Sequence, residues 1–255
     1  MRDLKYKNIF ITITTLISFI VVWQLVSLSG RFSVYILPKP ITVVETAYEL
    51  LVSGELIRHL LISLERIFWG YLLAIIISSI LTLLLCSSSL IKSIIDPPLN
   101  FLRQIPPLAL LPLLLAWVGI GEEQKIAVII LGCLFPILFN FIGGVEQVDK
   151  KLIDVAKVLN LNKSQIFYRI YLPSALPSIL IGLRVGLGFS WRSLVGAELI
   201  ASSAGLGYMM LDAESLARTD IILVGVLVIG CMGMFTDYLL SKLINKLSPW
   251  HAQEK

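Results

Sequence analysis

Charged residues are scarce in this chain. Asp, Glu, Lys and Arg make up 15% of its 255 residues, while hydrophobic residues make up 57% and the mean hydropathy is +0.88. A soluble domain carries about 25% charged residues. The shortage argues against an ordinary soluble protein, and a net charge of +4 without a basic cluster argues against a nucleic-acid partner. Composition therefore predicts a polytopic membrane protein.

Cysteine and histidine are also rare. Cys86, Cys133 and Cys231 lie in apolar runs without metal-ligand spacing, which favours small buried side chains. His59 lies in an amphipathic region near the outer surface and His251 in the C-terminal tail, and each is too isolated to form a metal site. The chain also lacks a G-x-x-x-x-G-K-[ST] loop, the sequence that cradles ATP phosphates. We expect no metal and no cofactor in this chain.

Long apolar stretches occur six times. A bilayer-spanning helix needs about 20 apolar residues. The stretches are Ile9–Leu28, Phe68–Cys86, Pro106–Ile120, Ile126–Val145, Ile179–Ile200 and Ile221–Leu243. The first is longer than the apolar region of a secretion signal, about 7–15 residues, and predicts an uncleaved span. The third is short and holds three prolines, which predicts a bent helix inside the bundle.

The distribution of Lys and Arg predicts the orientation. With a cytoplasmic N-terminus, the inner segments hold Arg2, Lys5, Lys7, Lys92, Arg103, Lys150, Lys151, Lys157, Lys163, Arg169, Lys242, Lys246 and Lys255. The outer segments hold only Arg31, Lys39, Arg58, Arg66, Lys125 and Arg218. Cytoplasmic segments are enriched in Lys and Arg, so both termini are predicted to be cytoplasmic.

Four regions follow from these predictions. Residues 1–36 hold a cytoplasmic tail and the first span, and 37–66 form an external amphipathic segment. Residues 67–248 form the transmembrane core with a cytoplasmic loop at 146–178, and 249–255 form a cytoplasmic tail. In the external segment, Thr42 and Glu45 fit a capping box and Gly54 fits a helix stop. Helical spacing after Gly54 predicts that the second span begins before Phe68.

The stretch "DVAKVLNLNKSQIFYRIYLP", Asp154–Pro173, is polar and lies between two apolar spans. Its spacing predicts a helix on each side of Asn160, which suits the left-handed conformation that closes a helix. Asn162 and Gln165 fit a capping box for the second helix, and Pro173 is predicted to end it. This stretch is therefore predicted to form either an interfacial helix lying on lipid headgroups or a docking element for another protein.

These residues carry a resemblance to a known family. Asp154-Val155-Ala156, then Asn160, then Ile170-Tyr171-Leu172-Pro173 resembles the EAA loop of membrane subunits of type I ABC importers. That loop has a Glu-Ala-Ala triplet, a Gly four residues later and an Ile-x-x-Pro-type ending. Three positions differ here: Asp154 for Glu, Val155 for the first Ala, and Asn160 for Gly.

The flanking sequence extends the resemblance from Leu37 to His251. "ILPKP", "SGELIRHLLISLERI", "IPPLALLPLLLAWVGIGEEQKI", "GLRVGLGFSWRSLVGAELIASSAGLGYM", "TDIILVGVLVIG" and "SPWH" are similar to the nitrate/sulfonate/taurine branch of these permeases. The resemblance implies an all-α, six-helix transmembrane fold that forms a homodimer in the cell membrane. It implies two separate ATPase subunits holding ATP and Mg²⁺, and an external substrate-binding protein. No nucleic acid is implied.

The resemblance also implies that the loop docks on the ATPase. The residues that would form or shape this dock are Asp154, Ala156, Asn160, Ile166, Phe167, Ile170, Tyr171 and Pro173.

Charges inside the spans indicate a second candidate site. Arg184, Arg192 and Glu198 lie in the fifth apolar stretch and Asp237 in the sixth. Each costs about 2.5–3.5 kcal/mol at the centre of a membrane helix, so they should face the bundle interior or a wet cavity. Arg184 and Glu198 are 14 residues apart and lie on roughly one helical face. Structural pairing and a lining for an anionic substrate both remain open.

Glycines in the same stretch offer a smooth strip for helix packing. Gly182 and Gly186 fit a G-x-x-x-G motif. The strip suits packing within the chain or between two copies.

The sequence leaves two other functions as alternatives. An intramembrane enzyme would need a nucleophile with a base, or paired carboxylates, and no such set is evident. A secondary carrier or channel not powered by ATP would leave the 154–173 stretch unexplained. The resemblance leaves the transported substrate open, because similar permeases carry taurine, other alkanesulfonates, nitrate, bicarbonate and organic precursors such as vitamin pyrimidines.

Overall fold

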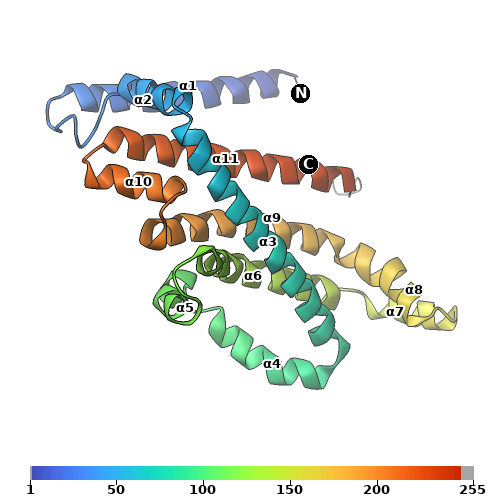
Figure 1. The fold of residues 1–255 in the computed structure, drawn as a ribbon. Coiled ribbons are helices and arrows are strands. Elements are labelled where there is room, and N and C mark those ends of the chain that lie inside the picture. Colours follow the sequence, from blue (N-terminus) through green and yellow to red (C-terminus); the bar gives the residue numbers. More distant parts are fainter. Residues whose placement is uncertain (1, 248–255) are drawn as a thin grey trace.

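The computed structural model describes residues 2–247, and every regular element in that range is helical (Figure 1). The long helices are α1 Arg2–Leu28, α3 Glu55–Ser87, α6 Glu122–Glu146, α9 Leu172–Ala201 and α11 Thr219–Leu247. The shorter ones are α2 Pro40–Val52, α4 Ser89–Leu102, η1 Pro107–Leu110, α5 Leu111–Val118, α7 Lys150–Val158, α8 Lys163–Ile166, η2 Phe167–Tyr171 and α10 Leu206–Ser215. Five helices are long and apolar enough to cross a membrane, or up to six if the bent pair at 89–118 is one span. The prediction of an all-α polytopic membrane fold is confirmed.

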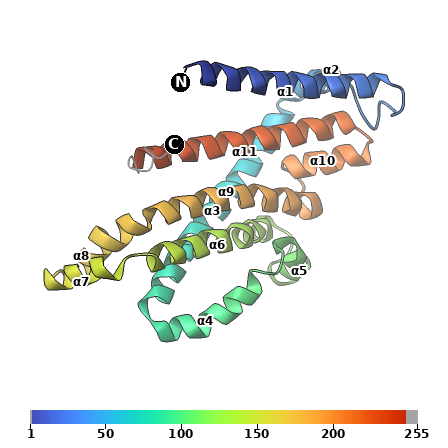
Figure 2. The ribbon, with the colours of Figure 1, turned by 180° about the vertical axis from the view of Figure 1, so that it is seen from behind.

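The helices run between two ends of the molecule. The start of α1, the end of α11 and the α7–α8 pair lie at one end, on the right in Figure 1, and α2, α5 and α10 lie at the other. The view from behind shows the same arrangement (Figure 2). The start of α1 and the end of α11 therefore share a side with the α7–α8 pair, as the charge distribution predicts. The predicted tail at 249–255 lies outside the described residues.

The core lies where α6 and α9 pack closely against each other. A Cβ added at Gly182 would meet the Cβ of Asn140 at 2.6 Å, and one added at Gly186 would meet Ile137 Cγ1 at 2.5 Å. Small residues of this kind let two helix backbones approach. The G-x-x-x-G strip thus packs within the chain, which decides between the two alternatives left open by the sequence.

The external segment differs in detail from its prediction. Helix α2 begins at Pro40 with Lys39 as its N-cap and no side-chain cap, so the proposed Thr42–Glu45 capping box is wrong. Proline at the first helical position has its φ already set for a helix, which starts α2 two residues before Thr42. Gly54 has φ +78° and separates α2 from α3, which confirms both the stop and the early start of the second span.

The third apolar stretch holds η1 and α5 and follows α4 after a sharp bend. Helix α4 and the η1–α5 segment meet at an angle of 89°, because Pro106 and Pro107 at the break cannot donate helical hydrogen bonds. Pro112 lies in the first turn of α5, where a proline is tolerated. The predicted bend is confirmed. The predicted interior position is wrong for the single chain, since Leu111 is the only buried residue of η1 and α5, and Ile120 is 88% exposed.

Candidate functional site

The turn between α7 and α8 is closed by local hydrogen bonds. Asn160 has φ +54°, its N–H donates to the Lys157 carbonyl at 2.9 Å, and the Leu161 N–H donates to the Ala156 carbonyl at 3.0 Å. This pair of bonds is the Schellman arrangement that ends a helix. Ala156 is almost fully buried beneath the turn. The prediction of a left-handed Asn160 is confirmed.

The second helix of the pair begins with the predicted cap. The Asn162 N–H donates to Gln165 Oε1 at 2.9 Å, and the Gln165 N–H donates to Asn162 Oδ1 at 2.8 Å. Each side chain satisfies a backbone N–H that has no partner inside the helix. The capping box is therefore confirmed.

Pro173 does not end the helix, and that prediction is wrong. In an α-helix the ring of Pro173 would clash with the Arg169 carbonyl. Arg169 lies in η2, a π-helical turn over Phe167–Tyr171, where carbonyls bond five residues ahead instead of four. Pro173 then sits in the first turn of α9. Residues Lys163–Ala201 form one continuous helical rod of 39 residues.

We define the tip as residues 154–171, which hold the end of α7, the Asn160 turn, α8 and η2. Asp154 is exposed and pairs with Lys157 at 3.2 Å. The predicted docking residues Ile166, Phe167, Ile170 and Tyr171 are half-buried. The exposed large side chains are Val155, Val158, Leu159 and Tyr168. Helical spacing at the sequence level did not distinguish these two faces, because packing against the bundle decides which one is covered.

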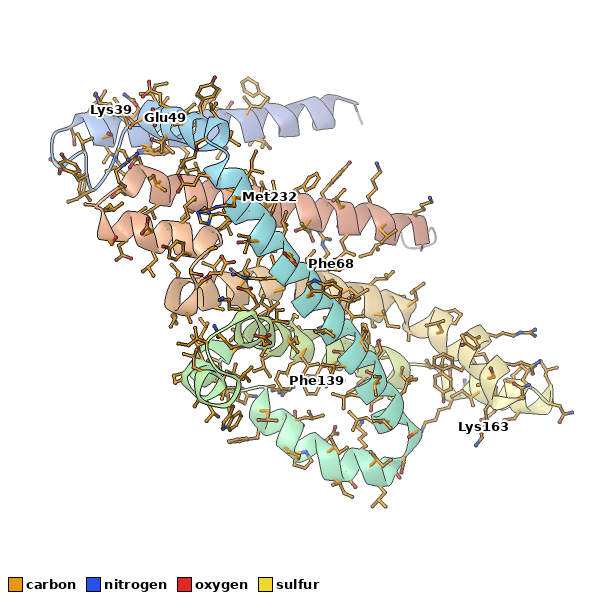
Figure 3. The ribbon with its side chains drawn as sticks, viewed as in Figure 1. Lys39, Glu49, Phe68, Phe139, Lys163 and Met232 are labelled. Carbon is orange, nitrogen blue, oxygen red and sulfur yellow. The ribbon has the colours of Figure 1, made fainter. Side chains whose placement is uncertain are left out.

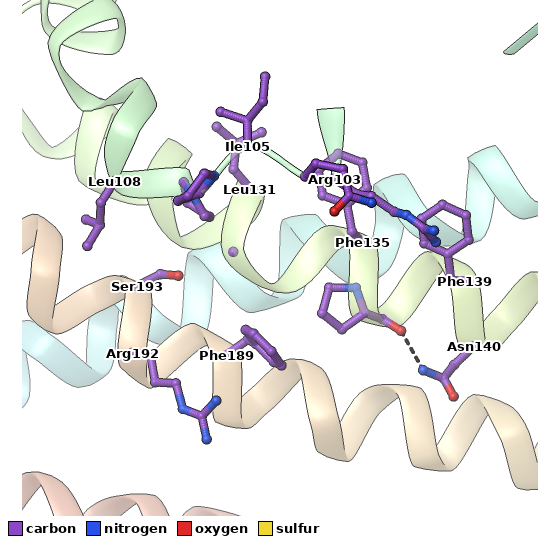
Figure 4. A pocket seen from close by; sticks show the side chains of 15 residues that line it. Arg103, Ile105, Leu108, Leu131, Phe135, Phe139, Asn140, Phe189, Arg192 and Ser193 are labelled. Atoms are coloured by element: carbon purple, nitrogen blue, oxygen red, sulfur yellow. Dashed lines mark hydrogen bonds between the residues drawn. The ribbon is translucent and has the colours of Figure 1, made fainter. Parts of the chain in front are cut away.

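A central cavity of about 500 Å³ lies between the α4–η1 break, α6 and α9. Figure 4 shows Arg103 beside Phe139 on one side of it and Arg192 at its α9 edge. The Arg103 guanidinium lies 4.7 Å from the centre of the Phe139 ring, and that of Arg192 lies 5.2 Å from the centre of the Phe189 ring. No carboxylate whose side chain the structure describes forms an ion pair with either arginine. The cavity therefore offers aromatic surface and the unpaired Arg103 to a ligand, with the unpaired Arg192 at its α9 edge.

Of the three path residues proposed from the sequence, only Arg192 lines this cavity. Arg184 makes two hydrogen bonds of 2.6 Å to Asp237 on α11. Glu198 is 0% exposed and bonds Arg66 instead. Arg184 and Glu198 thus belong to separate ion pairs, although their spacing suggested one face. Arg103 also lines the cavity, because the chain breaks beside it, between α4 and η1, at Pro106 and Pro107. The distribution of Lys and Arg had placed its charge in a cytoplasmic segment.

Glu198 belongs to a buried polar cluster beside the start of α10, at the end of the molecule opposite the tip. Its carboxylate accepts hydrogen bonds of 2.8 Å from Arg66 Nη1, from Ser63 Oγ and from the Gly207 N–H. Arg66 also donates to both oxygens of Glu122, at 2.6 and 2.7 Å. We call Ser63, Arg66, Glu122 and Glu198 the Arg66 network. It joins α3, α6, α9 and the start of α10.

The loop before α10 closes over this network. The Arg66 guanidinium donates to the Ala204 carbonyl at 2.6 Å, and the Gly205 N–H donates to His59 Nδ1 at 3.0 Å. Gly205 has φ +116°, and a Cβ there would lie 2.3 Å from Glu198 Oε1. Glycine is therefore required for the loop to approach the carboxylate.

The fold and these features define a helical, multi-pass membrane protein with a turn-capped helix pair outside the spans and a cavity among them. This arrangement resembles a solved amino acid ABC transporter, with a TM-score of 0.62, 17% identity, and coverage of 81% of this chain and 96% of that one. At this identity the likeness establishes the fold, and the predicted type I importer fold is confirmed.

Residues 67–249 match the family model described as "Binding-protein-dependent transport system inner membrane component". The chain belongs to this family of ABC transport permeases. It is 40% identical over 231 residues to the putative aliphatic sulfonates transport permease protein SsuC of Bacillus subtilis (strain 168), covering 91% of this chain and 84% of the relative. It is 34% identical over 262 residues to the taurine transport system permease protein TauC of Escherichia coli (strain K12), covering 99% and 95%.

Proposed function

We propose that this chain is the membrane-spanning permease subunit of an ABC importer for a small anion of the taurine, alkanesulfonate or nitrate type. Two copies would form the path across the cell membrane, with an external binding protein on the α10 side. Two separate ATPase subunits, which hold ATP and Mg²⁺, would dock at the tip. The observation that carries the proposal is the tip: exposed apolar side chains on a turn-capped helix pair that continues into α9.

The continuous rod explains how the two ends would communicate. Helix α8, the π turn and α9 form one helix, and Phe189 and Arg192 on α9 line the central cavity. A displacement of the tip by the ATPase would therefore move the cavity wall. Lying on lipid headgroups would need neither the Asn160 turn nor this continuity, which favours the docking alternative.

The tip can be tested through its backbone. Valine in the left-handed conformation costs about 1–2 kcal/mol, whereas glycine adopts it freely. We expect Asn160→Val to reduce transport several-fold while Asn160→Gly keeps it, with equal amounts of each protein in the membrane. The measurement is binding-protein-stimulated ATPase activity beside substrate uptake in proteoliposomes. Unchanged coupling in Asn160→Val would count against the tip as a lever.

The substrate class is inferred from the central cavity. Its two arginines carry no carboxylate partner in the described residues, and both lie over aromatic rings, an environment that suits a small anion. The relatives named for aliphatic sulfonates and taurine support the same chemistry. Uptake of radiolabelled taurine, an alkanesulfonate and nitrate by the complete transporter would separate the three.

Arg192→Gln should lower anion uptake about tenfold. A hydrogen bond to a charged group contributes about 1.5–3 kcal/mol, and Arg192 lies at the cavity edge, so the lower value applies; about 1.4 kcal/mol is tenfold. The control is Arg184→Gln with Asp237→Asn, which removes an ion pair outside the cavity. Uptake that is normal in Arg192→Gln, or equally reduced in the control, would remove Arg192 from the path.

The partners are tested by purification. A tagged chain expressed with its neighbouring genes should retain a protein that carries a G-x-x-x-x-G-K-[ST] loop, identified by mass spectrometry. Substrate uptake by this chain alone in ATP-free vesicles would instead support the secondary carrier.

A further inference from the structure

A second cavity, of about 740 Å³, lies between the ends of the membrane helices and the tip. We call it the basal cavity. Its walls come from the end of α3, the start of α4, the end of α6, and α7, α8 and η2. Nothing in the proposed transport cycle uses this space, although it separates the bundle from the docking element.

The basal cavity is cationic. Lys92, Lys150 and Lys163 line it together with a single carboxylate, Glu146. Lys92 forms an ion pair with Glu146. Lys150 and Lys163 form no ion pair with any described residue. Lys163, labelled in Figure 3, lies at the start of α8 and so brings its charge from the tip side.

Apart from three Ser and Thr side chains, the rest of the wall is mostly apolar, and it continues onto the surface of the spans. Phe167 and Tyr171 line the cavity from η2, and Leu83 lines it from α3. Leu83 is exposed, and so are Leu90 and Ile94 on the neighbouring α4. In a membrane Leu83, which lies within the span α3, would face acyl chains. The cavity therefore has a cationic end and an apolar end that opens toward lipid.

The depth of the cavity agrees with a lipid headgroup. The spans α3 and α6 end at Ser87 and Glu146, and Lys92 and Lys150 follow those ends by a few residues. Lysines at this level place their ammonium groups in the headgroup layer. Basic pockets between membrane helices on the cytoplasmic side bind anionic headgroups.

We propose that the basal cavity binds one anionic phospholipid, with its phosphate between Lys150 and Lys163 and an acyl chain along Leu83. A free phosphate would use the same lysines, but it would leave the apolar wall without a partner. Because Lys163 opens the rod that continues into α9, the lipid would also tie the tip to the bundle. That consequence rests on the proposed transport function, whereas the binding itself does not.

The test compares two double variants of the complete, full-length transporter. Lys150→Gln with Lys163→Gln removes the two unpaired lysines of the cavity. Lys151→Gln with Lys157→Gln makes the same change of charge in the same segment, and neither residue lines the cavity. Binding is measured by native mass spectrometry in detergent, with phosphatidylglycerol and phosphatidylcholine of identical acyl chains.

We expect one retained phosphatidylglycerol per chain in the wild type and in the Lys151/Lys157 control, and at least fivefold weaker retention in the cavity variant. Phosphatidylcholine should be retained weakly by all three. Equal losses in the two double variants would overturn the proposal, because bulk charge would then explain the binding. Displacement of the lipid by inorganic phosphate or glycerophosphoglycerol at millimolar concentration would also overturn it, since the site would then belong to a soluble anion.

A second measurement needs no substitution. Cys86 lines the basal cavity, and Cys231 is a thiol on α11, outside it. Both are exposed, so the expectation of a buried side chain holds for Cys133 and is wrong for these two. Phosphatidylglycerol should slow maleimide labelling of Cys86 several-fold relative to Cys231, as quantified by peptide mass spectrometry. Equal labelling rates in phosphatidylglycerol and in phosphatidylcholine would contradict an occupied cavity. This outcome is independent of transport, so it separates failure of the lipid site from failure of the proposed function.

Discussion

Arg66→Met should cause the largest loss of stability of any substitution considered for this chain. Glu198 is 0% exposed and Arg66 is 3% exposed, and their atoms lie 2.8 Å apart. Removing one partner of a buried pair leaves an uncompensated charge and costs about 3–5 kcal/mol. The variant should therefore show a much lower apparent Tm and a strongly reduced yield of monodisperse protein, measured by fluorescence-detected size-exclusion chromatography after heating.

Two comparisons make this prediction specific. Adding Glu198→Gln to Arg66→Met should recover much of the loss, because the amide carries no charge and its oxygen can still accept from Ser63 and Gly207. Lys157→Met removes a charge from an exposed pair and should change stability by about 0–1 kcal/mol. If Arg66→Met and Lys157→Met had the same apparent Tm, the Arg66 network would not hold α3, α6 and α9 together.

Leu159→Asp should abolish retention of the ATPase while the chain itself stays folded. Leu159 is 66% exposed at the tip, so its substitution removes little internal packing. In a complex it would place an unpaired carboxylate against an apolar surface, and hot-spot substitutions at interfaces cost about 2 kcal/mol or more. Co-purification of the ATPase with the tagged chain, quantified by mass spectrometry, measures the effect.

The matched control is Leu216→Asp. Leu216 is also 66% exposed, but it lies at the end of α10, at the opposite end of the molecule from the tip (Figure 1). Its variant should retain the ATPase at the wild-type level. Equal retention by Leu159→Asp and Leu216→Asp would show that the ATPase docks elsewhere, and loss in both would indicate a general defect in folding or expression.

At the tip, the hydrogen bonds between near neighbours in the chain could be predicted from the sequence, whereas the packing against the bundle could not. The Asn160 turn and the Asn162–Gln165 cap were predictable because each depends on hydrogen bonds within five residues of the chain. Pro173 was misjudged because its effect depends on the π turn before it. The same periodicity that predicted two amphipathic helices did not reveal which face the bundle would cover.

The sequence by itself determined the membrane class, the approximate spans and the capped turn, because composition, hydropathy and local capping act within a few turns of helix. The family followed from the resemblance of its motifs to known permeases. Only the tertiary structure decided that Glu198 pairs with Arg66 across 132 positions, that Arg184 pairs with Asp237, and that Arg103 and Arg192 share a cavity. A charged side chain in an apolar span must find a partner, but many partners satisfy that requirement. Which partner each charge finds depends on how closely α3, α6 and α9 pack. Glycines such as Gly186 set the distance between helix axes, but they do so only after the helices have come into contact.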